Sequence, residues 1–189
     1  PPQKFKSIHM LGVRYGYSFC TVSSSPTVGE EYLFCPMNFS LLYTYYHALW
    51  NQLFNFGVQF GVKYGEEGYA SKYEQWGERY KIIEVPLVSQ FKIDFSRFRF
   101  LVNAGGYYGY RLSTARESGW DRYDLRHDYG ILAGVGLAVV FKPFEIQIEG
   151  NYKFSLCSIY HTNKFSDEYW MLCYPRNIML SVGLFVHLW

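Results

Sequence analysis

Two histidines of this chain have acidic or hydroxyl residues close by in the sequence, and such residues could together catalyse hydrolysis. His127 precedes Asp128, and His161 lies near Ser158 and Thr162. A hydrolase needs a nucleophile, a base and a group that orients the base, all within hydrogen-bond reach. Adjacent residues of an extended strand point to opposite faces, and neither group places three such residues on one face. We therefore expect a protein that is not an enzyme, with a lipid-modifying membrane enzyme as the weaker alternative.

Four cysteines could form crosslinks. Cys20 and Cys35 flank one long polar segment, and Cys157 and Cys173 flank another. They form no CxxC pair and have no histidine at zinc-ligand spacing, so we expect neither a metal site nor a cofactor. Four cysteines allow three pairings, and we predict Cys20 with Cys35 and Cys157 with Cys173 because each pair would join neighbouring strands in an oxidising compartment. Each crosslink would contribute roughly 3 kcal/mol.

Charged side chains recur at alternate positions. Between residues 145 and 156 the odd positions are polar and the even positions are mostly apolar, and residues 54–64 alternate in the same way. Because a β-strand sends alternate side chains to opposite faces, one face of each segment is polar. The charged residues that we predict to lie inside are Arg14, Lys63, Glu84, Lys92, Arg97, Arg99, Arg111, Glu145, Glu149 and Lys153. Shielded charges need partners, so we expect a polar network that closes the interior, or otherwise a narrow ion path or ligand pocket.

Period-two alternation across nearly the whole chain predicts eight strands. Their expected ranges are Ile8 to Cys20, Met37 to Tyr46, Leu53 to Tyr64, Tyr80 to Ile93, Phe98 to Leu112, Tyr129 to Phe141, Phe144 to Leu156 and Asn177 to Trp189. Many reach the roughly 9–11 residues with which a tilted strand crosses a bilayer. Short connections alternate strictly with long polar ones, which places all long loops at one end, as in outer-membrane barrels.

The last strand indicates which face is outside. Its even positions are all aliphatic, whereas its odd positions mix small, polar and bulky residues. An eight-stranded barrel has an interior that ordinary side chains just fill, so the bulky apolar faces must point outward. The sequence therefore predicts an all-β, eight-stranded antiparallel up-and-down transmembrane β-barrel, with a soluble lipocalin-like barrel as the alternative. The side chains of the last strand expected to face lipid are Ile178, Leu180, Val182, Leu184, Val186 and Leu188.

Composition fits one membrane barrel domain over residues 1–189. Aromatic residues make up 21% of the chain and charged residues 18%, a balance typical of membrane-facing strands. The longest apolar run, Ile131 to Phe141, is far shorter than the roughly 20 residues of a spanning helix. Lys and Arg are scattered and the net charge is only +2, so we expect no nucleic-acid partner. No signal peptide is visible, and we expect the chain to be a processed or trimmed form.

The final nine residues resemble the C-terminal β-signal of outer-membrane proteins. Ser181, Gly183, Val186 and Leu188 match its polar, glycine and hydrophobic positions, and Trp189 supplies an aromatic residue one place after the last hydrophobic position. The resemblance implies insertion by the barrel-assembly machinery.

The chain also resembles the PorT-like family of outer-membrane β-barrels. The segments that carry this resemblance are residues 83–87 (IEVPL), 104–110 (AGGYYGY) and 128–136 (DYGILAGVG). It implies an outer-membrane location with long loops outside and both termini in the periplasm, and no catalytic residues come with it. Some members act in secretion or assembly complexes. The apolar outer faces lead us to expect contact with outer-membrane lipid, and the lack of catalytic geometry together with long loops rich in Tyr and Trp leads us to expect another outer-membrane protein as partner. A loop-based ligand binder or a narrow channel is the alternative function.

Overall fold

Long β-strands make up most of the computed structural model, which describes residues 7–27, 29–48, 54–72, 77–164, 167–168 and 170–188. The strands are β1 (Ile8–Ser25), β2 (Glu30–Glu31), β3 (Leu33–Ala48), β4 (Phe54–Ser71), β5 (Glu78–Phe95), β6 (Phe98–Thr114), β7 (His127–Phe141), β8 (Phe144–Ser155) and β9 (Leu172–His187). Within this described part of the chain, no helix is long and apolar enough to span a membrane.

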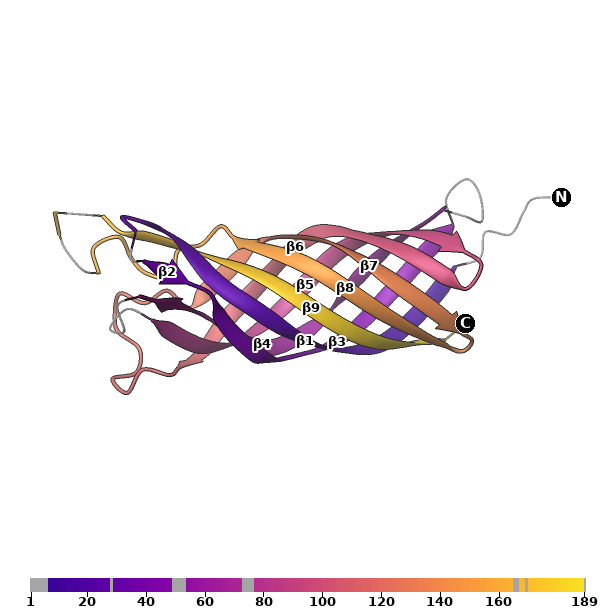
Figure 1. Cartoon of the computed structure of the whole chain (residues 1–189), viewed down its shortest axis with the longest axis horizontal. Helices are drawn as coiled ribbons and strands as arrows, with labels where there is room; N and C mark the ends of the chain where they lie inside the picture. Colours follow the sequence, from indigo (N-terminus) through magenta and orange to yellow (C-terminus); the bar gives the residue numbers. More distant parts are fainter. Residues whose placement is uncertain are drawn as a thin grey trace.

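Eight of these strands close into a barrel. Each pairs antiparallel with its neighbour along the chain, β1 pairs with β9, and β4 pairs with β5 to complete the ring. The two-residue strand β2 pairs only with the end of β4, outside the ring. The predicted fold class, an eight-stranded antiparallel β-barrel, is confirmed, and Figure 1 shows its strands running obliquely along the long axis.

The two ends of the barrel differ. The connections β1–β3, β4–β5, β6–β7 and β8–β9 lie at one end, called here the loop end, and the connections with fewer residues lie at the other, called the turn end (Figure 1). Met10 near the start of β1 pairs with His187 at the close of β9, so both strand termini lie at the turn end. This alternation follows from the up-and-down order of the strands.

Several strands run further toward the loop end than the sequence predicts. β1 continues to Ser25 and β4 to Ser71, well past the predicted ends at Cys20 and Tyr64. The outward positions there change from apolar to polar, as from Phe19 to Thr21 on β1, so the alternation on which the prediction depends disappears. The strands persist because each neighbour also continues and pairs with the backbone.

The outward face of the barrel is apolar. On β9, Leu180 and Val182 are 53% and 54% exposed, while the alternate residues Ser181 and Gly183 are buried. The same alternation runs around all eight barrel strands, which gives a continuous apolar wall far larger than the patches that soluble monomers expose. This wall fits lipid and contradicts the soluble alternative.

Glycines bring neighbouring strands together on the inner face. Gly61 in β4 lies opposite Leu42 of β3, and a Cβ atom at Gly61 would clash with the carbonyl oxygen of Leu41. Gly150 in β8 instead faces outward, where a Cβ atom would meet only Leu180 Cδ2 at 3.5 Å.

Gly61→Ala is expected to lower the free energy of unfolding by about 1–3 kcal/mol, because the backbone of β3 must move to admit the methyl group. The matched control Gly150→Ala is expected to change it by less than about 0.5 kcal/mol. Equilibrium urea unfolding of both variants in lipid vesicles measures the difference. Equal stability of the two variants would contradict the close inner packing.

Candidate functional site

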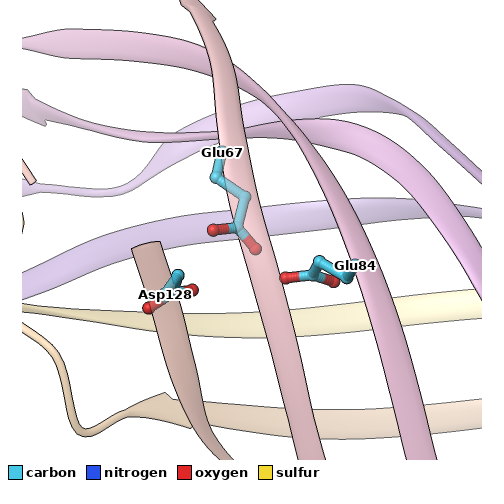
Figure 2. Close-up of side chains that lie close together, drawn as sticks. All are labelled: Glu67, Glu84 and Asp128. Carbon is cyan, nitrogen blue, oxygen red and sulfur yellow. The ribbon is translucent and has the colours of Figure 1, made fainter. Parts of the chain in front are cut away.

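Three buried carboxylates converge inside the barrel toward its loop end. Glu67 comes from β4, Glu84 from β5 and Asp128 from β7, and Figure 2 shows their carboxyl groups gathered in the interior. One carboxylate oxygen of each lies within 4.8 Å of the others. Such a group of acidic side chains is stable in a closed lumen only if cations neutralise it.

The neutralising cations come from the protein. The ammonium group of Lys153 on β8 contacts the carboxylates of Glu67 and Glu84 and lies 3.6 Å from Asp128 Oδ2. Lys63 Nζ lies 2.9 Å from Glu84 Oε2, and Arg111 Nη2 lies 3.3 Å from Asp128 Oδ1. These three cations balance the three carboxylates. We call the six residues the loop-end cluster.

The arrangement suits the side-chain ammonium group of Lys153 better than a bound metal ion. Lys153 Nζ touches all three carboxylates and so takes the place that a metal would need among them. Asn177 Nδ2 also donates a hydrogen bond of 2.8 Å to Glu67, and Ser155 donates one to Asp128. Each carboxylate thus has partners from the protein, although Glu67 Oε2 and Asp128 Oδ2 accept no hydrogen bond, and the cluster fills this part of the lumen.

A second ion pair fills the middle of the lumen. Arg14 Nη2 lies 2.6 Å from Glu149 Oε1, and Asn103 Nδ2 and Asn151 Nδ2 donate hydrogen bonds of 2.8 and 3.2 Å to Glu149 Oε2. Between this pair and the loop-end cluster lies a cavity of about 50 Å³. A buried water needs roughly 10–15 Å³ by this measure, so the cavity has room for a few waters and no more.

A third group of charges lies near the turn end. Arg99 pairs with Glu145 and with Asp94, where Nε lies 2.8 Å from Oδ1. His187 Nε2 lies 2.9 Å from Glu145 Oε2. The ammonium of Lys92 lies 4.2 Å from the centre of a neighbouring tyrosine ring, a favourable cation–π arrangement. The lumen therefore carries ion pairs along its length, with the ammonium of Lys92 against an aromatic ring instead of a carboxylate.

Most of the charged residues predicted for the interior are buried there. The structure buries Arg14, Lys63, Glu84, Lys92, Arg99, Arg111, Glu145, Glu149 and Lys153. Arg97 instead lies exposed in the turn between β5 and β6. Sequence reasoning missed Glu67 and Asp128, which it assigned to loops. Glu67 lies four residues after Lys63 and therefore on the same face of an extended strand. This spacing could have identified it as an inward residue.

The residues of the last strand divide between the two faces. Ser181, Gly183 and the Phe185 ring lie inside, while the aliphatic row from Ile178 to Leu188 lies on the outer wall. Within that row Val186 is only half-buried, and the other five side chains are exposed. Trp189, the terminal residue of the predicted assembly signal, lies outside the described residues.

The candidate catalytic histidines are not brought together with partners. His127 is exposed on the outer wall, where Nδ1 lies 2.6 Å from the Tyr108 hydroxyl oxygen, whereas Asp128 points into the lumen. Ser158 Oγ accepts hydrogen bonds from backbone N–H groups, one of them from Cys173 at 3.2 Å. His161 is exposed. The geometry gives none of these residues a nucleophile–base contact.

The predicted disulfides are not confirmed, because all four cysteines have free thiols. Cys20 and Cys35 are both buried, on the paired strands β1 and β3. Ser18 lies opposite Cys35, so the two cysteines are diagonal rather than direct partners. Diagonal residues have Cα atoms roughly 7–8 Å apart, beyond the separation of about 4.4–6.8 Å that a disulfide favours. Both pairings stay predictions.

The loops fold together over the loop end. Ile159 and Tyr160 from the β8–β9 loop and Trp120 from the β6–β7 loop pack against Tyr69 and Tyr80, which extend from the barrel wall. The hydroxyl oxygens of Tyr69 and Tyr160 lie 3.0 Å apart. We call this covering structure the loop cap. Trp76, another loop tryptophan, lies outside the described residues.

Ion pairs hold the loop cap together. Asp124 pairs with Lys164 and lies 3.3 Å from Arg116 Nη1, and Arg116 also pairs with Glu78. Burial raises the pKa of the Asp124 carboxyl, but the hydrogen bond from Lys164 and the nearby cations outweigh it and leave the pKa below its usual value. Asp124 is thus charged at neutral pH and joins the two long loops.

Lys153→Met is expected to lower the free energy of unfolding by about 3–5 kcal/mol, because it leaves buried carboxylates without their cation. Adding Glu67→Gln should recover part of the loss, since it removes one of those carboxylates. Urea unfolding in lipid vesicles measures both effects, with Lys142→Met in the exposed β7–β8 turn as the control. A loss no larger than that of the control would show that the loop-end cluster does not stabilise the barrel.

Comparison with known proteins shows which solved structures have a similar fold. No family model and no curated protein sequence matches the chain. Its structure is similar to the crystal structure of Neisserial surface protein A, with a TM-score of 0.54 and 14% identity over 94% of this chain and 96% of that one. The outer membrane protein AlkL, solved in lipid bilayers, gives a TM-score of 0.47 and 12% identity over 99% of this chain and 93% of that one. The chain has the fold of small outer-membrane β-barrels.

Proposed function

We propose that this chain is a non-enzymatic barrel of the bacterial outer membrane that acts as an interaction or scaffold subunit of an outer-membrane protein assembly, of the secretion or envelope-biogenesis type. The observation that carries the proposal is the closed lumen. Three groups of paired charges and a loop cap occupy it, and only about 50 Å³ remains between two of those groups. A barrel without an open interior offers its outer surfaces for function.

The loop cap is the surface best suited to a protein partner. Trp170 in the β8–β9 connection is 71% exposed. Tyrosine and tryptophan are enriched at protein interfaces because they bury large areas while keeping a polar group. Hydrogen bonds and ion pairs order the cap, so a partner would meet a largely preformed surface.

Orientation and biogenesis belong to the same proposal. In the expected arrangement the loop end faces the outside and the turn end faces the periplasm, as the pattern of long and short connections in outer-membrane barrels favours. The barrel-assembly machinery would insert the chain through its last strand, on which Ser181 and Gly183 face inward and Val186 and Leu188 face outward. A relationship to the PorT-like family is part of the proposal and rests on the sequence motifs.

A narrow channel or a small-ligand binder is the second candidate. The cavity between Arg14 and Lys153 favours this second function, because polar groups of the central ion pair and of the loop-end cluster line that space. A conducting path would require the ion pairs of the loop-end cluster to open.

A photoreactive diazirine amino acid at Trp170, irradiated in native membranes, is expected to give a discrete protein adduct on a denaturing gel. The same group at Leu180 on the outer wall should give lipid adducts, because that position faces the bilayer. Mass spectrometry of the Trp170 adduct identifies the partner. Lipid adducts alone at both positions would contradict an interaction subunit that uses its loop cap.

A further inference from the structure

A polar groove lies on the outer wall of the barrel near its loop end. It runs over β1, β9 and β8 and encloses about 210 Å³. The segment around β2 contributes to one side of it. The residues that line it are Thr21, Val22, Ser23, Glu30, Tyr32, Tyr152, Arg176 and Ile178. None of these residues belongs to the loop-end cluster, so the groove is a separate site.

The groove lies where the apolar wall ends. On β9 the outward side chains are aliphatic as far as Ile178, and the next outward residue is Arg176. Arg176 pairs in register with Thr21 of β1, the position at which the outward row of β1 changes from Phe19 to a hydroxyl residue. This boundary between apolar and polar wall corresponds to the headgroup level of a bilayer.

Arg176 presents donors that the protein leaves unused. Its guanidinium lies 5.3 Å from the centre of the Phe154 ring, and because Nε is shielded, the donors open to a ligand are those of the two Nη atoms. Among the described residues, no carboxylate lies within ion-pair distance of it. A guanidinium is a rigid fork of donors that matches the geometry of a phosphate. The stacking contact holds this fork at the edge of the groove.

The rest of the lining complements a phosphate and the chain attached to it. Hydroxyl groups of Thr21, Ser23 and Tyr32 provide further donors on the polar side. Ile178 provides apolar surface on the membrane side. The single carboxylate of the groove, that of Glu30, accepts a hydrogen bond of 3.5 Å from the Ser24 backbone N–H. Arg176 and Glu30 carry the two full charges among the lining residues, and the hydroxyl groups can act as donors toward an anion.

We propose that this groove binds the phosphate group of a membrane lipid, with Arg176 as its principal ligand. The phosphate accepts hydrogen bonds from the guanidinium, and the acyl chains follow the apolar wall below Ile178. This assignment depends on the membrane position of the apolar wall and is independent of any protein partner.

The test is a titration of the detergent-purified barrel with dioctanoyl phosphatidylglycerol, followed by native mass spectrometry. Arg176→Gln is expected to raise the dissociation constant about ten-fold, the effect of losing one charged hydrogen-bond donor. Arg97→Gln is the matched control, because Arg97 is an exposed arginine at the opposite end of the barrel. Its dissociation constant should equal that of the unchanged protein. Arg176→Lys, which keeps the charge and loses the fork, should fall between the two.

Two further probes separate the sources of the phosphate. Dioctanoylglycerol, which lacks the phosphate, should bind Arg176→Gln and the unchanged protein equally weakly. Inorganic phosphate should bind far more weakly than the lipid, since it has no chains to contact the wall. Equal affinity of Arg176→Gln and Arg97→Gln for the phospholipid would overturn the proposal. Inorganic phosphate binding as tightly as the phospholipid would overturn it as well, because the groove would then be a general anion site.

Discussion

Charges buried inside this barrel need partners inside the same barrel; ion pairs supply them for most of the described lumen charges, and a tyrosine ring does so for Lys92. The wall faces lipid on the outside, and the charged side chains of the described lumen are almost wholly buried. An unpaired charge in such a place costs several kcal/mol. The lumen meets this constraint most fully at Lys153, whose ammonium joins carboxylates from β4, β5 and β7 to β8. Strands that are not neighbours in the sheet are thereby tied across the interior.

The closed lumen also determines where function can lie. Most interior charges are bound to groups of the same barrel, as the four polar contacts of Glu149 illustrate. What remains is the outer surface, which offers two distinct features: the ordered, aromatic loop cap and the polar groove beside Arg176. One suits a protein and the other a lipid phosphate. A barrel anchored by lipid at the level of its headgroups would hold its cap at a fixed height above the membrane.

Much of this architecture could be predicted from alternation alone. Positions such as Lys63 and Glu149 reveal the inner face because their neighbours are apolar, and the aliphatic row of the last strand reveals the outer face. Prediction failed where alternation stops: Glu67 and Asp128 lie on strand segments whose outward residues are polar or mixed. The register of Cys20 and Cys35 depends on an irregularity between Gly16 and Ser18 that no local pattern indicates. The loop cap arises from contacts between distant loops, which a single sequence does not reveal.

The most direct test of the account is the electrical conductance of the purified barrel in a planar lipid bilayer. Because paired charges close the lumen, the unchanged protein should insert without any resolvable current in either polarity. Insertion can be verified independently by protection of the wall from protease. Discrete, reproducible current steps from the inserted, unchanged protein would contradict the closed lumen and would favour the channel instead.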